Sequence, residues 1–208
     1  MNEFLSIGQA LRMATEKLAP ASESPRLDAE LLLARALDVS RSYLFAHPDD
    51  LMDPQAAGRF AHTLGERVNG VPLAYFTGEK EFWSMPLAVS PATLVPRPET
   101  EVIVEQALLR IPRHAEMQLL DLGTGSGAIA LAIAMERSGC HVVAVDISVE
   151  ALAVAALNAR QLMIPNVEFL AGDWIKPVSE RIFDLVVSNP PYVASGDPHL
   201  RELRHEPR

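Results

Sequence analysis

A glycine-rich turn between an apolar strand and an apolar helix restricts the fold of this chain more than any other feature. The turn, Asp121–Gly127, reads Asp-Leu-Gly-Thr-Gly-Ser-Gly and leads into a helical segment that runs through Met135. Beyond it, short apolar segments alternate with a helical segment, a pattern typical of a buried parallel sheet with crossover helices. We therefore expect an α/β domain. The expected strands are 119–122, 141–145, 167–170 and 183–187, and a helix is expected at about 148–162.

A helical region precedes the sheet. Apolar residues recur there at spacings of three and four, and Ser24-Pro25, Ser40 and Asp53-Pro54 resemble helix starts. From Tyr75 to Val89 the pattern becomes strand-like and predicts a hairpin, after which a proline-rich stretch, Leu94–Glu101, leads into another helix. We expect a small all-helical domain over residues 1–74, a β-hairpin linker over 75–93 and the α/β domain over 94–208.

Composition and charge exclude several classes of protein. The 208 residues carry 18 basic and 27 acidic side chains, a formal net charge of −9, so no long-range positive field attracts nucleic acid. The chain contains one cysteine, Cys140, which excludes an intrachain disulfide, and its histidines lack the spacing of a metal site. The sequence shows no membrane span or signal segment. We expect a cytoplasmic protein without a metal.

The glycine turn has three possible interpretations. Its glycines let the backbone turn sharply and leave bare N–H groups for a ligand. With Ala128 it fits the loose dinucleotide pattern, so a nicotinamide cofactor is one candidate. Asp121 lies two residues before the first glycine, and a carboxylate there favours a ligand with an ammonium and a sulfonium over a pyrophosphate. A tight turn without any ligand is the third interpretation.

Two further strand ends carry acidic residues. Asp146 ends the second expected strand, where it can accept hydrogen bonds from ribose hydroxyls or, alternatively, cap the next helix. Gly172-Asp173-Trp174 follows the third strand, so Asp173 can accept from an exocyclic amine and Trp174 can lie against a purine ring. The alternative for Trp174 is a place in the core. We favour a nucleoside site at this edge of the sheet.

The most specific motif is Asn189-Pro190-Pro191-Tyr192, directly after the fourth expected strand. Two successive prolines cannot continue a strand ladder, so the chain leaves the sheet rigidly. The Asn189 side-chain oxygen and the Pro190 carbonyl can accept both protons of a planar NH2 group, and the Tyr192 ring can lie against its plane. These contacts would hold a poorly nucleophilic amide or aromatic amine against an electrophilic carbon.

Together these motifs resemble those of class I S-adenosylmethionine-dependent methyltransferases. The helical region, the hairpin and Leu94–Glu101 narrow the resemblance to the HemK/PrmC family of protein-(glutamine-N(5)) methyltransferases, which act on peptide chain release factors. The resemblance covers essentially the whole chain. It implies a Rossmann-like fold, S-adenosyl-L-methionine as cofactor, S-adenosyl-L-homocysteine as product, and the glutamine of a Gly-Gly-Gln loop as methyl acceptor.

The family resemblance also implies a role for each motif. Gly123–Gly127 would wrap the methionine part of the cofactor, Asp146 would bind the ribose, Trp174 would lie beside the adenine, and Asn189 would contact cofactor and substrate. The helical domain would help to hold the release factor, and we expect a monomer. The expected cofactor-binding residues are Asp121, Gly123, Thr124, Gly125, Ser126, Gly127, Asp146, Asp173, Trp174 and Asn189; the substrate-binding residues are Asn189, Pro190, Pro191 and Tyr192, with Asn189, Pro190 and Tyr192 catalytic.

The family's catalytic domain continues with further strands and helices past the Asn-Pro-Pro-Tyr motif, whereas this sequence stops at Arg208. We therefore expect a truncated domain, incomplete at its C-terminal edge, in which the 183–187 strand is an unprotected edge. Three alternative functions stay open: methylation of a ribosomal-protein glutamine, methylation of adenine-N6 in DNA, and cofactor binding without activity. The eleven basic and seventeen acidic residues of 76–208 argue against DNA.

Overall fold

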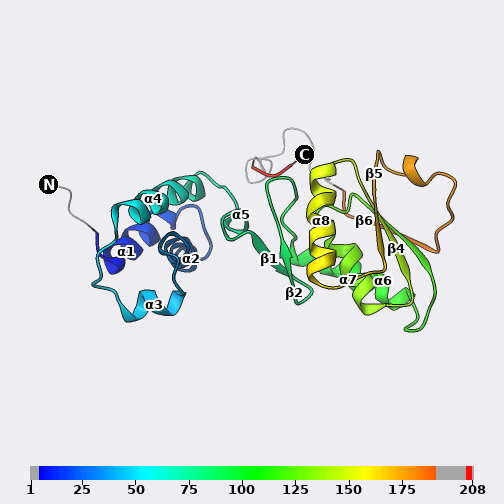
Figure 1. Ribbon diagram of the computed structural model, residues 1–208, viewed down its shortest axis with the longest axis horizontal. Coiled ribbons are helices and arrows are strands. Elements are labelled where there is room, and N and C mark those ends of the chain that lie inside the picture. The colour runs from blue at the N-terminus through cyan, green and yellow to red at the C-terminus, as the bar shows by residue number, and fades with distance from the viewer. Residues whose placement is uncertain (1–4, 191–204, 208) are drawn as a thin grey trace. The chain divides into compact units, whose positions relative to one another are not determined.

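The computed structural model describes residues 5–190 and 205–207. The chain divides into two compact units, Met1–Thr77 and Gly78–Arg208. The first is helical and the second contains the parallel sheet (Figure 1). Within the described residues, no helix is long and apolar enough to cross a membrane.

The first unit is a small bundle whose helix starts follow local capping rules. Ser40 and Asp53 accept hydrogen bonds from backbone N–H groups in the first turns that follow them, as their positions predict. Ser24 departs from the prediction: it precedes Pro25 at the helix start, but its side chain makes no capping bond. The helices are α1 (Ile7–Leu18), α2 (Pro25–Leu37), α3 (Arg41–Ala46) and α4 (Pro54–Val68).

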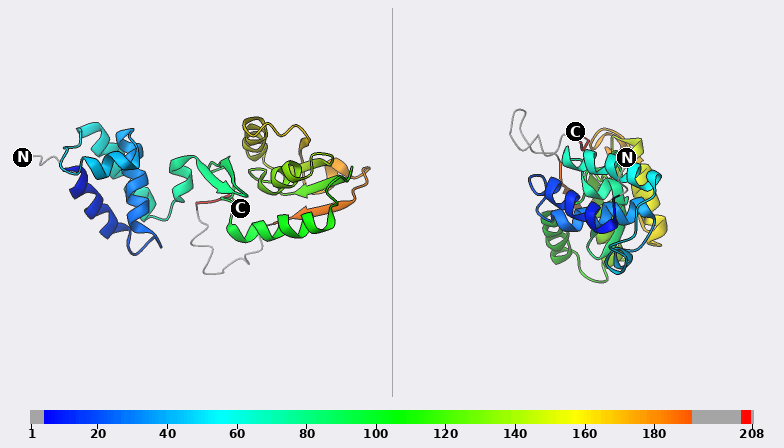
Figure 2. Two further views of the ribbon diagram at one scale, coloured as in Figure 1. Left: turned by 90° about the horizontal axis from the view of Figure 1, so that it is seen from below. Right: turned by 90° about the vertical axis from the view of Figure 1, so that its left-hand side faces the viewer.

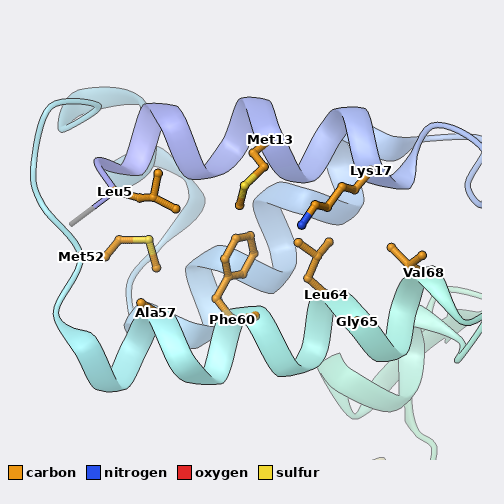
Figure 3. A pocket seen from close by; sticks show the side chains of 10 residues that line it. Leu5, Met13, Lys17, Met52, Ala57, Phe60, Leu64, Gly65 and Val68 are labelled. Carbon is orange, nitrogen blue, oxygen red and sulfur yellow. The ribbon is translucent and has the colours of Figure 1, made fainter. Parts of the chain in front are cut away.

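An apolar groove of about 280 Å³ runs between α1 and α4. Figure 3 shows Phe60 and Leu64 of α4 opposite Met13 of α1, with the Lys17 amine reaching over the groove. Phe60 and Leu64 also belong to the buried core of the bundle. The groove therefore marks a place where the two helices leave part of that core accessible.

The strand predicted from Tyr75 starts too early, because Tyr75, Phe76 and Thr77 belong to a short helix, α5 (Leu73–Thr77). Leu73 and Phe76 pack against the core of the bundle, and Gly78 ends the helix with a φ of +77°. The prediction of a strand at Tyr75 and Phe76 is therefore wrong. The hairpin starts later, with β1 (Glu79–Phe82) and β2 (Met85–Ala88).

The hairpin packs within the second unit. Phe82, Met85 and Leu87 are buried in the main core of that unit. The turn is made by Trp83 and Ser84, both in the left-handed region with φ of 51° and 58°. The backbone N–H of Trp83 donates to Glu101 Oε1 at 2.9 Å. These contacts attach the hairpin to the start of the first helix of the α/β domain.

Four parallel strands form the sheet in the order β5-β4-β3-β6. The last strand starts at Leu185, two residues later than predicted; at Asp184 the side chain, and not a backbone carbonyl, accepts from the Gln118 N–H, while the Asp184 N–H donates to the Gln118 carbonyl. The strands are β3 (Gln118–Leu122), β4 (His141–Asp146), β5 (Val167–Ala171) and β6 (Leu185–Ser188), and the helices are α6 (Glu101–Arg110), α7 (Ala128–Glu136) and α8 (Val149–Gln161).

The two faces of the sheet contribute to different cores. Leu119, Val142 and Ala144 lie in the core that includes all of α7 except its last two residues. Val143 and Val145 belong to a smaller cluster on the other face. Helix α6 packs against α7 and runs beside β6 (Figure 2). Because α7 is buried between the sheet and α6, it is apolar on all sides.

Candidate active site

The strand order places two of the predicted motifs next to each other. Strands β4 and β5 follow one another on one side of β3, and β6 lies on the other side of β3, so the strand order reverses next to β3. Ligands of open parallel sheets bind at such a reversal, beyond the carboxyl ends of the strands. Leu122 pairs with Ser188, and the Ser188 hydroxyl donates to the Leu122 carbonyl at 2.8 Å. The glycine turn and Asn189 therefore leave the sheet side by side.

The three glycines of the turn have different surroundings. All have positive φ: 73° at Gly123, 57° at Gly125 and 84° at Gly127. A Cβ built on Gly123 or Gly125 would meet no atom within 4 Å, whereas one on Gly127 would lie 3.1 Å from Ala155 and from Leu131. The first two glycines thus border open space where a ligand can approach the backbone, and the third allows close helix packing.

This difference predicts distinct effects of two matched substitutions. Gly127→Ala should destabilise the protein by about 3 kcal/mol, because left-handed strain adds to an overpacked contact. Gly125→Ala should cost about 1 kcal/mol and weaken cofactor binding about tenfold or more, since its methyl group enters the open space. Thermal unfolding and calorimetric titration of both variants check this. Equal stability losses, or cofactor binding unaffected by Gly125→Ala, would contradict the assignment.

Asp121 is a fully buried carboxyl group with one oxygen unpaired. Its Oδ2 accepts from the Thr124 hydroxyl at 2.7 Å, while its Oδ1 has no hydrogen-bond partner in the described part of the chain. The pKa of Asp121 is raised to about 6, chiefly by burial and also by the charge of Asp146, against the lowering effects of the Thr124 hydroxyl and the nearby Ala130 backbone N–H. A buried unpaired acceptor is costly, so it indicates a missing cationic or donor partner.

Asp146 links the second strand end to the glycine turn. Its Oδ2 accepts from the Gly125 N–H at 2.8 Å and its Oδ1 from the Ser148 N–H at 2.9 Å. The cap of α8 is Ser148, whose hydroxyl accepts from the Ala151 N–H at 3.0 Å. The alternative considered for Asp146 was to cap this helix, but Ser148 supplies the capping bond. Each carboxylate oxygen keeps a lone pair for a ligand hydroxyl.

The third strand end is more exposed. Trp174 is 54% exposed with a φ of 51°, so it is not a core residue. The Asp173 carboxylate forms an ion pair with the Lys176 amine. The exposed indole ring of Trp174 is available to a planar ligand ring, whereas the Asp173 carboxylate is already paired with the Lys176 amine.

Asn189 and Pro190 follow β6 directly, and Pro191 and Tyr192 lie outside the described residues. The Asn189 Nδ2 donates to the Thr100 hydroxyl at 3.1 Å. Its Oδ1 has no hydrogen-bond partner within the described ranges. The acceptor needed for a planar NH2 group is therefore available at the carboxyl end of β6.

Sequence reasoning missed a buried amide that supports the site. Asn158 of α8 has no exposed surface. Its Oδ1 accepts from the Ala88 N–H at 2.7 Å, and its Nδ2 donates to the carbonyls of Ala88, at 3.0 Å, and of Ser126, at 2.9 Å. Asn158 thus joins the glycine turn to the hairpin. A polar residue on the apolar stripe of the predicted helix was the one available signal.

Comparisons with known proteins decide the family. Two family models match: "PrmC N-terminal domain" over residues 9–78 and "Methyltransferase domain" over residues 113–203. The release factor glutamine methyltransferase of Coxiella burnetii is 44% identical over 99% of this chain and 74% of its own length. That of Salmonella typhimurium is 50% identical over 90% of this chain and 68% of its own length. This chain belongs to the release factor glutamine methyltransferase family.

Membership in the release factor glutamine methyltransferase family fits the geometry of the site. The chain is an S-adenosyl-L-methionine-dependent methyltransferase with a Rossmann-like sheet, as the resemblance implied. A solved S-adenosylmethionine-dependent methyltransferase from Thiobacillus denitrificans, in complex with S-adenosyl-L-homocysteine, is 29% identical over 44% of this chain and 36% of its own, with a TM-score of 0.37. The open space at Gly123 and Gly125 and the unpaired Asp121 oxygen suit a cationic nucleoside ligand.

Proposed function

We propose that this protein methylates the side-chain amide nitrogen of the glutamine in the Gly-Gly-Gln motif of peptide chain release factors. The observation that carries the proposal is the pairing of Leu122 with Ser188, which sets the open glycine turn beside Asn189. Methyl donor and amide acceptor can then meet at one reversal of the sheet. Release factors act with the ribosome, so the proposal also places the enzyme in the cytoplasm.

The proposed cofactor site uses the residues around the glycine turn. Asp121 would accept from the ammonium group, Asp146 from the ribose hydroxyls, and Trp174 would lie against the adenine, with Asp173 accepting from its amine. When bound, S-adenosyl-L-methionine supplies an electrophilic methyl group on a sulfonium and leaves as S-adenosyl-L-homocysteine. Gly123, Thr124, Gly125, Ser126 and Gly127 form the turn around its methionine part.

The proposed acceptor site addresses the weak nucleophilicity of an amide. Its nitrogen lone pair is delocalised, so holding the group in one orientation matters more than removing a proton with a strong base. Asn189 Oδ1 accepts one N–H, the Pro190 carbonyl accepts the other, and Pro191 and Tyr192 complete the support. Fixed acceptors cost no reorganisation during the reaction and align the nitrogen with the incoming carbon. As the N–C bond forms and the C–S bond breaks, one amide N–H proton is lost to water. We further propose that the helical domain, residues 1–74, helps to hold the release factor.

A methyl-transfer assay with labelled cofactor tests the function. The chain is offered a purified release factor, the same factor with its Gly-Gly-Gln glutamine changed to alanine, a large-subunit ribosomal protein, and adenine-containing DNA. We expect label on the unmodified release factor alone, at the glutamine. Label on the ribosomal protein or the DNA in its place would select that alternative, and cofactor binding without transfer to any substrate would indicate a binding protein.

A further inference from the structure

Thr100 lies where its hydroxyl contacts the proposed acceptor residue from a distant part of the chain. The Asn189 Nδ2 donates to Thr100 Oγ1 at 3.1 Å across 89 residues of sequence. Thr100 is buried, with 9% of its surface exposed. The bond is partly buried, and a hydrogen bond shielded from water is costly to leave unmade, so it restricts the Asn189 side chain.

The hydroxyl of Thr100 is not used in the usual way. Thr100 stands at the first boundary of α6, where threonine normally accepts from the N–H of a later residue in the first turn. Here its backbone is already helical, with φ of −68° and ψ of −23°, and its side chain makes no capping bond. The hydroxyl therefore does not cap its own helix and instead accepts from Asn189.

The segment that carries Thr100 is itself anchored. The carboxylate of Glu206, which is buried, accepts from the Val95 N–H at 3.0 Å and forms an ion pair with Arg97. The Thr100 N–H in turn donates to the Arg97 carbonyl at 3.0 Å. Because β-branched threonine also has few side-chain rotamers, its oxygen is held in a defined direction.

We propose that Thr100 is a positioning residue, which holds the Asn189 amide with Nδ2 turned inward and Oδ1 turned toward the substrate glutamine. The inference rests on the proposed function. An asparagine amide is nearly symmetric in shape, and a half-turn about its last bond exchanges oxygen and nitrogen. In the exchanged state Asn189 would present N–H groups to the substrate N–H groups. In the structure the Thr100 hydroxyl accepts from Nδ2, which leaves Oδ1 turned away from Thr100 and available to accept from the substrate.

Three variants of the full chain test this inference. Thr100→Val removes the acceptor at nearly constant shape, and Thr100→Ser keeps it. Thr93→Val is the matched control, because Thr93 is also a buried threonine of this segment but its hydroxyl donates to the Ser90 carbonyl. We expect Thr100→Val to lower kcat about tenfold with KM for the release factor changed less than threefold. Thr100→Ser should restore kcat to within about threefold, and Thr93→Val should lower Tm while leaving kcat within about twofold.

A spectroscopic measurement separates this inference from the proposed function. In 15N-labelled protein the side-chain NH2 signals of Asn189 are assigned by their loss in Asn189→Ala. We expect one of these proton signals to lie downfield in the wild type and in Thr100→Ser, and to move upfield in Thr100→Val. Unchanged Asn189 signals in Thr100→Val would overturn the inference even if release factors are methylated. A Thr100-dependent shift in a protein that methylates no glutamine would overturn only the proposed function.

Discussion

Replacing Asn189 by alanine is expected to lower the rate of methyl transfer at least about 100-fold while the protein stays folded and still binds S-adenosyl-L-methionine. The change removes the side-chain acceptor that we propose for the substrate amide, and loss of one fixed polar group at a reacting centre typically has this magnitude. Only a modest loss of cofactor affinity is expected, because Asp121 and Asp146 are untouched. Single-turnover kinetics and calorimetric titration measure the two effects.

Two further variants sharpen the Asn189 experiment. Asn189→Gln keeps the amide but moves it by one methylene group, so it should also be slow if position matters. Asn69→Ala, at the end of α4 in the helical unit, is the control for an asparagine-to-alanine change and should keep the wild-type rate of the transfer step, even if release-factor binding changes. Transfer at the wild-type rate by Asn189→Ala would exclude the proposed acceptor site.

The Asp121→Asn variant is expected to be more stable than the wild type but to bind the cofactor between about 10-fold and 100-fold more weakly. The pKa of Asp121 is raised from 3.8 to about 6, chiefly by burial, so the folded state holds this proton more tightly than the unfolded chain. Ionisation then costs the folded state up to about 3 kcal/mol above pH 6. The weaker binding follows from loss of a charged acceptor for the ammonium group.

The sign of the pH dependence follows from the same raised pKa. Asp121 opposes folding least below pH 4 and increasingly as the pH rises through about 6, so the stability gain of Asp121→Asn should be near zero at pH 4 and largest at pH 8. Cofactor affinity of the wild type should rise over the same interval, and that of the variant should not. Asp38→Asn, at an exposed left-handed position, is the control and should change neither property. A stability gain without any loss of affinity would exclude the ammonium contact.

Features encoded within a few residues were predictable. The caps at Ser40 and Asp53, the glycine turn and the strand ends at Leu122 and Asp146 each follow from local chemistry, and the structure places them as expected. The alternation of strands and helices also fixed the parallel sheet, because such a pattern allows few other topologies.

Features that depend on distant partners were not predictable. The contact of Thr100 with Asn189 spans 89 residues, and that of Asn158 with Ala88 spans 70. The helix at 73–77 was missed because it depends on the packing of Leu73 and Phe76 against the bundle, which no local pattern shows. Asp184 leaves the last strand because of its bonds to Gln118, a partner far away in sequence.

The bonds of Asn158 have a consequence for the hairpin edge. Ala88 ends β2 opposite Glu79 of β1, and its N–H and C=O both bond to the Asn158 amide. That amide occupies the positions that the backbone of a third strand would take. One side chain thereby substitutes for a neighbouring strand and denies the hairpin edge to strands of other molecules, a protection against aggregation that sheets more often obtain from charges or prolines.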